Sequence, residues 1–440
     1  MLKKLAYSLG AVATAISYQA FSTYLIFFYV DVLKLPVALA GSAILLYGLW
    51  NAVNDPLFGF LSDNTRTRWG RRIPYLLAGA IPFGLLFFLL WVPPFDGIDH
   101  ALELFLYLAI LICLFDALYT ITVLNWAALF PEMFPTDQER AQVNVFRQSL
   151  GMIGLLLGIA LPPLFYSTWG WPSMGALFGC LISLTMLIAV WGSRENKAFS
   201  RPQPLPFWPA LKATLRNRSF LTFVLANLFV QYTFTLIMAT IPFFAKYVLN
   251  ANPQRVTVIL AAAFLTAIPM LFVWKRVAVR FGAKQAFLAS LLLLALFLTP
   301  LFYVQSFGLV VLTAALIGAA MAGFILVADL VIADIIDEDE LTTGHRREGM
   351  YFGLNAFITR FAIGLEAFSM SAVFIMSGYN PYVFTQYAEF RAGLRFLIAG
   401  LPIIALAIGF SIMLFYPLAG HKLAELKTRL AEAHAKQAAS

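Results

Sequence analysis

The sequence predicts an all-α membrane protein with twelve transmembrane helices arranged as two related bundles of six. Hydrophobic residues make up 61% of the 440 residues and charged residues only 12%, and the mean hydropathy is +0.82, which is outside the range of soluble domains. The apolar stretches are about 20 residues long, the length that a helix needs to cross a bilayer. A basic turn that follows the second stretch recurs after the eighth.

Charge and motif content exclude several classes of function. A membrane protein keeps its Lys and Arg in loops on one side, so the net charge of +8 requires no nucleic-acid partner. Cys113 and Cys180 lie in apolar stretches, where cysteine behaves as a small hydrophobic residue. The sequence has no His or Cys at metal-ligand spacing, no nucleophile beside a base and no Gly-rich phosphate loop. We therefore expect neither an enzyme nor a cofactor.

Each of the twelve stretches is long enough for one helix, and the first has no signal-peptide cleavage pattern. The predicted spans are Tyr7 to Val30, Leu39 to Leu61, Pro74 to Val92, Leu102 to Leu124, Phe146 to Phe165, Met174 to Trp191, Phe220 to Tyr247, Val256 to Trp274, Gln285 to Val304, Gly308 to Ile332, Met350 to Met376 and Phe396 to Tyr416.

The basic residues set the expected orientation. Placing the N-terminus inside puts most Lys and Arg on the cytoplasmic side, as the positive-inside rule requires. Both termini are then cytoplasmic in a multi-pass plasma (inner) membrane protein. We expect one six-helix bundle at 1–192, a Pro-rich basic linker at 193–218, a second bundle at 219–417 and a tail at 418–440.

The two bundles carry matching features. RWGRR at Arg68 to Arg72 follows the second span, and RFGAK at Arg280 to Lys284 follows the eighth. The same offset takes Arg147, in the fifth span, to the neighbourhood of Arg360 in the eleventh. Paired halves of this kind are typical of transporters that bind a solute between the halves near the bilayer midplane.

Asp55 is the most informative single residue. It lies within an apolar run, beside Asn54 and one helical turn after Asn51. A charge at the bilayer centre costs roughly 2.5 to 3.5 kcal/mol, so an acid there usually faces a partner or an ion path. A structural acid paired with Arg147 or Arg360 is the alternative.

Four motifs along the chain carry a family resemblance. They are YVDVLKLP from Tyr29, NDPLFGFLSDNTRTRWGRRIPY from Asn54, ALFPEMFPTDQERAQVNVFR from Ala128 and DEDELTTGHRREGMYFG from Asp337. In this order they resemble the glycoside-pentoside-hexuronide:cation symporters, the melibiose-permease branch of the major facilitator superfamily. The resemblance implies the major facilitator fold and symport of a cation with a small solute by alternating access.

The resemblance also implies a cation site. The family's acid before the proline of the second helix falls on Asp55, and its threonine on the fourth helix falls on Thr120. The family's other second-helix acid is Asn51 here. A site with Asn51 and Thr120 as neutral ligands suits Na+, which we favour, but a buried Asp could also carry a proton.

The solute site departs from the family pattern as well. The acids that hold sugar hydroxyls fall on Ala15 and Val123, whereas the basic residues on helices five and eleven are kept as Arg147 and Arg360. Two guanidinium groups suit an anion, so we expect a sugar derivative or another organic anion. A lysophospholipid symporter and an uncoupled uniporter or flippase on the same fold remain open alternatives, and we expect the protein to act as a monomer.

Other residues are candidates by position. Tyr18, Trp126, Asn227, Gln231 and Asn355 could contact the solute, although aromatic packing and interhelical hydrogen bonds give the same patterns. Asp116 lies one turn before Thr120 on the same helix face, and we weigh a role at the ion site and a role in helix packing equally. Loop charges could latch the bundles on the cytoplasmic side, or could serve topology alone. These are Asp63, Arg66, Arg68, Arg71, Glu132, Arg140, Asp337, Arg346, Arg347 and Glu348.

Overall fold

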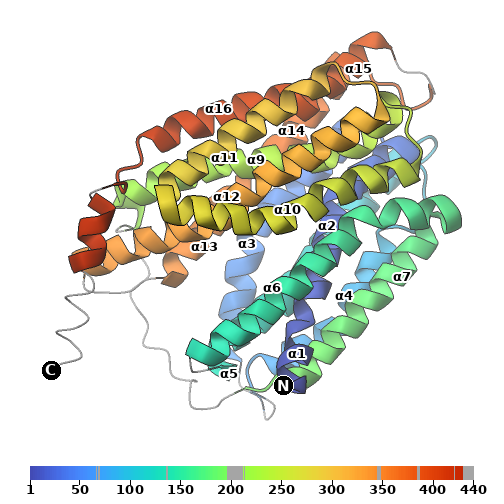
Figure 1. Ribbon diagram of the computed structural model, residues 1–440. Coiled ribbons are helices and arrows are strands. Elements are labelled where there is room, and N and C mark those ends of the chain that lie inside the picture. The colour runs from blue at the N-terminus through green and yellow to red at the C-terminus, as the bar shows by residue number, and fades with distance from the viewer. Residues whose placement is uncertain are drawn as a thin grey trace. The chain divides into compact units, whose positions relative to one another are not determined.

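A computed structural model describes residues 1–65, 67, 70–134, 137–195, 212, 214–343, 348–383, 387–420 and 422–429, apart from some side chains within helices. Apart from an isolated bridge between Thr67 and Gly70, these residues contain no strand. The helices (Figure 1) are α1 Leu2–Ser8, α2 Gly10–Ile26, η1 Phe27–Val32, α3 Val37–Asn64, α4 Ile73–Leu89, α5 Ala101–Met133, α6 Asp137–Ala160, α7 Pro162–Gly192, α9 Arg218–Tyr247, α10 Pro253–Phe281, α11 Ala283–Leu298, η3 Thr299–Phe302, α12 Phe307–Thr343, α13 Glu348–Thr359, α14 Phe361–Met376, α15 Ala388–Arg395, η4 Phe396–Gly400 and α16 Leu401–Leu414.

The helices account for the predicted spans. In the described part of the chain, ten helical stretches are long and apolar enough to cross a bilayer, and two shorter apolar helices cover Val37–Asn51 and Ile73–Leu89. The shorter two fall at the predicted second and third spans. The fifth span was expected to reach Phe165, whereas α6 ends at Ala160 and α7 begins at Pro162. The backbone of α7 is non-helical at Gly170, with φ of 81° and ψ of 168°, so a kink separates its first part from the predicted sixth span. Proline is favoured at the first helical position, where its missing N–H costs nothing.

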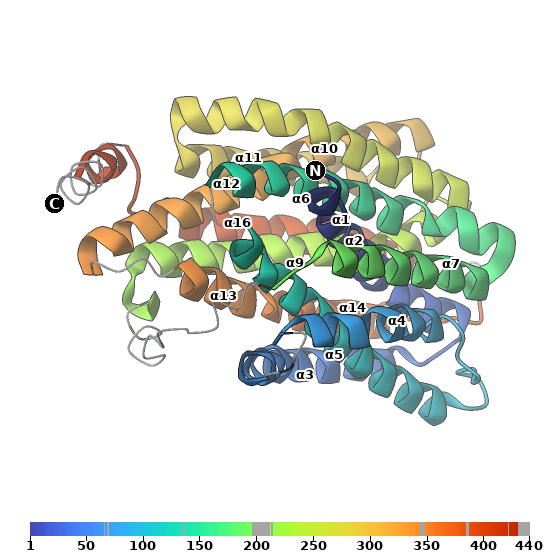
Figure 2. The same ribbon diagram turned by 90° about the horizontal axis from the view of Figure 1, so that it is seen from below.

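Small residues let α4 and α7 pack closely. Figures 1 and 2 show these two helices side by side. A Cβ atom added to Gly84 would lie 2.1 Å from the backbone oxygen of Gly179, and one added to Gly179 would lie 2.5 Å from the backbone oxygen of Gly84. Gly175 precedes Gly179 by one turn, which gives the small-xxx-small spacing of close membrane-helix pairs.

The chain divides into two compact units. Unit 1 comprises Met1–Pro202, Met238–Val258 and Ala367–Arg391, and unit 2 comprises Gln203–Ile237, Ile259–Glu366 and Ala392–Ser440. Unit 1 thus contains the first six predicted spans together with parts of α9, α10, α14 and α15. The division into bundles at 1–192 and 219–417, with a linker and a tail, stays a prediction about topology.

Candidate cation site

Four polar side chains converge between α3 and α5, two helices of unit 1 that lie beside each other in Figure 2. Asn51 and Asn54 lie one turn apart on α3, and Asp116 and Thr120 lie one turn apart on α5. Spacings of three and four residues put side chains on the same face of a helix. Each helix therefore presents a pair of polar groups to the other.

The carboxylate of Asp116 is the centre of this cluster. It accepts hydrogen bonds from Nδ2 of Asn51 at 2.6 Å and from Nδ2 of Asn54 at 2.7 Å. Nδ2 of Asn54 also donates to Oγ1 of Thr120 at 2.8 Å. All four residues are buried, and Asp116 is only 3% exposed. Both asparagine amides are neutral, so they solvate the carboxylate without cancelling its charge.

The cluster also contains acceptors without donors. In the part of the chain that the structure describes, Oδ1 of Asn51 and Oδ1 of Asn54 are buried and have no hydrogen-bond partner. A buried polar atom left in this state costs about 1–3 kcal/mol. One carboxylate, two amide oxygens and one hydroxyl are the kind of oxygen ligands that hard cations take. Because the terminal amide torsion of asparagine is soft, either amide can turn its oxygen toward a cation.

The structure brings together Asn51 and Thr120, two of the three residues expected at the cation site. Asp55, the third, lies on α3 by its backbone, but its side chain is outside the described residues. The expectation for Asp55 therefore stays a prediction. Asn54 belongs to the cluster but was absent from the expected site. Asp116, which was weighed evenly because of its spacing from Thr120, also belongs to the cluster.

Arg147 lies against aromatic rings of α5. Its guanidinium carbon is 4.5 Å from the ring centroid of Trp126 and 4.6 Å from that of Phe130. Among the described residues, its Nε is buried without a hydrogen-bond partner. Trp126 is itself held by packing, because its Nε1 donates to the backbone oxygen of Tyr7 at 2.9 Å. The guanidinium of Arg147 thus stacks on the indole ring, and the indole N–H already donates to the backbone of Tyr7.

The remaining solute candidates are divided between the units. Tyr18 in unit 1 lies with its ring centroid 6.3 Å from that of Tyr119. In unit 2, Nδ2 of Asn227 donates to Oδ1 of Asn355 at 3.0 Å, which joins α9 to α13. This is the interhelical hydrogen bond that we considered as the alternative. The other two expected residues, Gln231 and Arg360, are half-buried in unit 2, and their contact with a solute stays a prediction.

Most of the expected cytoplasmic latch is outside the described residues. This applies to residues Arg66, Arg68, Arg346 and Arg347 and to the side chains of Asp63, Glu132, Arg140 and Glu348. Asp337 is half-buried on α12. Arg71 contacts Glu195, which follows α7, through an ion pair of 3.5 Å and through its backbone N–H at 2.9 Å. Glu195 also accepts the backbone N–H of Arg72 at 3.1 Å, so it caps the start of α4.

A second buried carboxylate, Asp31, lies at the end of the first span that is remote from the N-terminus. It accepts hydrogen bonds from Lys246 and Tyr247 at the end of α9 and from the hydroxyl of Tyr379 at 2.8 Å. All of these residues belong to unit 1. Burial, and then the charge of Asp31, raises the pKa of Tyr379, so this phenol stays a donor. Sequence patterns gave no reason to connect these positions.

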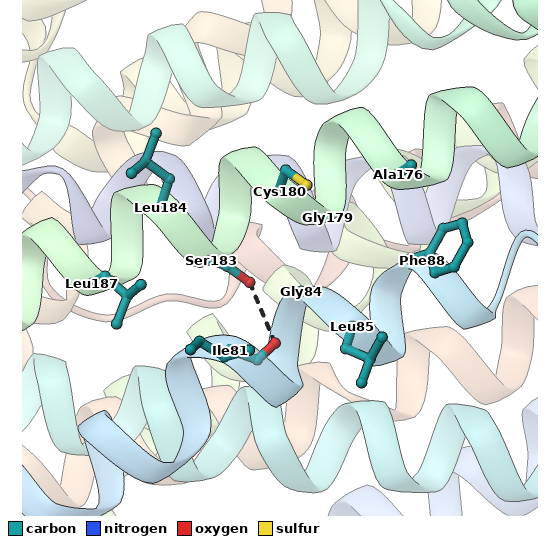
Figure 3. Close-up of a pocket in the computed structure, with 10 residues that line it drawn as sticks. All are labelled: Ile81, Gly84, Leu85, Phe88, Ala176, Gly179, Cys180, Ser183, Leu184 and Leu187. Atoms are coloured by element: carbon teal, nitrogen blue, oxygen red, sulfur yellow. Dashed lines mark hydrogen bonds between the residues drawn. The ribbon is translucent and has the colours of Figure 1, made fainter.

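An apolar groove of about 520 Å³ lies on the surface between α4 and α7. Figure 3 shows its ten lining residues, with Oγ of Ser183 donating to the backbone oxygen of Ile81 at 3.3 Å. Ile81 and Leu184 are exposed by 59% and 56%. Exposed apolar side chains around a groove in a membrane helix pair suit lipid chains, and the groove offers no charged group for a solute.

Comparison with known proteins decides the family. The model of the family described as MFS/sugar transport protein matches residues 6–420. The chain belongs to this family. The prediction of the major facilitator superfamily and its symporter branch is thereby confirmed.

The relatives of this chain are named as transporters and symporters, and the solutes in their names differ. A Synechocystis symporter is 26% identical and covers 94% of both chains. The isoprimeverose transporter of Lactiplantibacillus pentosus is 27% identical over 66% of this chain and 62% of its own. The sodium-dependent lysophosphatidylcholine symporter 1-A of Danio rerio is 24% identical over 94% of this chain and 85% of its own. The chain is accordingly a membrane-embedded secondary active symporter and not an enzyme.

The solved structures support the same fold. The nucleoside transporter NupG has a TM-score of 0.69 at 14% identity, and the similarity covers 95% of this chain and all of that one. At this identity the likeness concerns the fold alone. The predicted all-α major facilitator fold is confirmed.

Proposed function

We propose that this symporter couples entry of its solute to a cation that binds between α3 and α5. The supporting observation is the convergence of Asn51, Asn54, Asp116 and Thr120 on one buried spot. Asp55, on the same helix as Asn51 and Asn54, is the acid that the family resemblance assigns to the ion. Buried acids in membrane helices usually mark ion or substrate paths.

The ligand set favours Na+ over a proton. A proton carrier needs one titrating acid, whereas this cluster adds amide and hydroxyl oxygens that a proton does not require. Buried amide oxygens without donors are costly, and coordination of a cation would satisfy them. The lysophosphatidylcholine symporters among the relatives are also named as sodium-dependent.

We propose a small solute with an anionic group. Support comes from Arg147, whose guanidinium stacks on two rings and forms no ion pair with any described residue. Guanidinium presents a planar fork that matches a carboxylate or a phosphate. Sugar acids carry the first group and lysophospholipids the second. Among the relatives, the lysophosphatidylcholine symporter is named for a solute with a phosphate group, whereas isoprimeverose is a neutral sugar.

Uptake by membrane vesicles tests the coupling. Vesicles that contain the wild-type protein should accumulate the solute when an inward Na+ gradient is imposed, and Asp55→Asn should reduce accumulation to the level of facilitated equilibration. Asp99→Asn, in an exposed loop, is the matched control and should transport normally. Equal accumulation by Asp55→Asn and the wild type would contradict the proposal, because the gradient would then act without this acid.

A further inference from the structure

A further buried acid, Glu366, lies on α14 and outside the candidate cation site. It is about three turns before the end of the apolar stretch Met350–Met376, which is long enough to cross a bilayer. Glu366 is only 6% exposed. In the part of the chain that the structure describes, its carboxyl group has no hydrogen bond and no ion pair. An ionisable group at such a depth is a candidate for function.

The fold of α14 turns Glu366 toward the protein interior. Ala362 and Met370, four residues to either side of it, are 1% and 2% exposed, and Phe374, one turn further, is 1% exposed. Residues at this spacing share one face of a helix. Phe368 points elsewhere and is 67% exposed. The carboxyl group is therefore placed on the buried face of the helix, and not on the face that would meet lipid.

The described contacts of α14 bring no charged group to Glu366. Residues of four other elements line a small cavity with α14 or pack on it, and all are apolar or small. They are Ile26 of α2, Val30 of η1, Val37, Ala40 and Gly41 of α3 and Phe243 of α9. Among the charged side chains that the structure describes on these elements, Asp31 and Lys246 bind each other, and Arg218 is exposed at the start of α9. Neither these nor Arg360, which directly precedes α14, interact with Glu366.

We propose that Glu366 is a proton-binding site, separate from the cation site between α3 and α5, and that it holds a proton in the conformation described here. An unpaired carboxylate buried in a membrane helix is costly, and such a group becomes neutral by taking up a proton. A metal cation would need several oxygen ligands, which the described contacts of α14 do not supply.

This inference goes beyond the proposed function, because it adds a proton to a symporter whose proposed coupling ion is Na+. In a conformation that let water reach Glu366, the carboxylate would be solvated and the proton would be released. Because the proton binds one conformation better than the other, the pH would then shift the balance between the two.

Infrared spectroscopy of the full-length protein in phospholipid vesicles detects the proton directly, because a protonated carboxyl group has a C=O stretch that a carboxylate lacks. At neutral pH, with choline chloride in place of NaCl, the wild type should show a band of this kind that shifts in D2O. Glu366→Gln should lose this band. Glu389→Gln, at an exposed position of α15, is the matched control and should keep it.

Thermal melting at different pH values gives a second readout. If the native state alone holds this proton at neutral pH, the melting midpoint of the wild type falls as the pH is raised to alkaline values, because the unfolded state binds fewer protons. Glu366→Gln carries a neutral amide of the same shape, so its midpoint should fall less over the same range. Glu389→Gln should follow the wild type.

The outcomes separate this inference from the proposed function. Identical carboxyl bands in the wild type and in a cooperatively melting Glu366→Gln would overturn the inference, because Glu366 would then be ionised. If Glu366→Gln does not fold, Glu366→Asp replaces it, and the band should change in frequency because the carboxyl group has moved. A band that Glu366→Asp leaves unchanged would overturn the inference too. None of these results depends on Na+ binding, which Asp55→Asn tests separately.

Discussion

Two buried carboxylates of this chain, Asp116 and Asp31, differ in the residues that contact them. Asp116 is held by neutral amides on a neighbouring helix, whereas Asp31 is neutralised by Lys246. The second arrangement pairs the carboxylate with an opposite charge. Burial alone does not distinguish them, because Asp116 and Asp31 are 3% and 2% exposed. Asp116 is the candidate for ion binding because it converges with Asn51, Asn54 and Thr120.

Arg147 gives a test of the solute class. Arg147→Lys keeps a positive charge near Trp126 and Phe130 but removes the planar fork that pairs with an anion. We expect the half-saturating concentration of a transported sugar acid or lysophospholipid to rise by about tenfold, or about 1.4 kcal/mol. The measurement is a saturation curve of solute-dependent thermal stabilisation. Arg276→Lys, on the exposed side of α10, should change nothing. An equal loss of response to neutral sugars and to anions would contradict an anionic solute.

At the scale of elements, Asp31 ties the first span to the end of α9 and to the segment after α14. Its side chain is fully buried while that of Lys246 is 36% exposed, so water screens part of the pair. The phenols of Tyr247 and Tyr379 supply further donors. Three segments that are far apart in sequence are therefore joined by one carboxylate within unit 1.

The pair of Asp31 and Lys246 predicts a pattern of stabilities. Lys246→Met should leave the carboxylate unbalanced and lower the free energy of unfolding by about 2 kcal/mol, after discounting for the exposure of the lysine. Adding Asp31→Asn should restore much of this loss, because removal of both charges avoids an unpaired buried one. Thermal melting of the two variants in detergent measures the difference.

Two other results of this melting experiment are informative. Lys284→Met removes a lysine that, among the described residues, contacts backbone oxygens and no carboxylate. It is the control for loss of a lysine without loss of an ion pair, and the second substitution at Asp31 should not rescue it. If the double variant at Asp31 and Lys246 melts below Lys246→Met, the charges at these positions do not compensate each other.

Sequence patterns located the elements better than the contacts between them. Hydropathy gave twelve spans because each must bury its backbone polar groups as one continuous helix. It misplaced the end of the fifth span, since Pro162 and Pro163 are apolar enough to extend the run although they begin α7. The polar residues Asn51 and Thr120 were expected together from the family resemblance. The central position of Asp116 depends on how α3 packs on α5, which no local pattern reports.

Glu195 and Asp31 show the same limit. Glu195 caps α4 through the backbone N–H groups of Arg71 and Arg72, although more than a hundred positions separate them in the sequence. Asp31 lies within a motif that we used only for the family resemblance. Such contacts form between segments that tertiary packing brings together, and their residue types are ordinary for loops and helix ends. The contacts therefore become visible only in the folded structure.

At the scale of the whole molecule, family membership and site geometry support different parts of the account. The match over residues 6–420 places the chain in the family described as MFS/sugar transport protein, and the similarity to NupG supports the fold. The cluster between α3 and α5 supports the proposal that a cation is coupled there. The solute stays the least constrained part, because relatives at 24–27% identity include a transporter named for isoprimeverose and one named for lysophosphatidylcholine.

Equilibrium binding of radiolabelled sodium to the purified full-length protein tests the central claim most directly, because it requires neither a known solute nor transport. Ionic strength is held constant with choline chloride, and wild type, Asp55→Asn and Asp99→Asn are compared in parallel. Saturable sodium binding by wild type and Asp99→Asn is expected, together with a loss of that binding in Asp55→Asn. Saturable binding that is unchanged in Asp55→Asn, or no saturable binding by the wild type, would contradict a sodium site that uses Asp55 between α3 and α5.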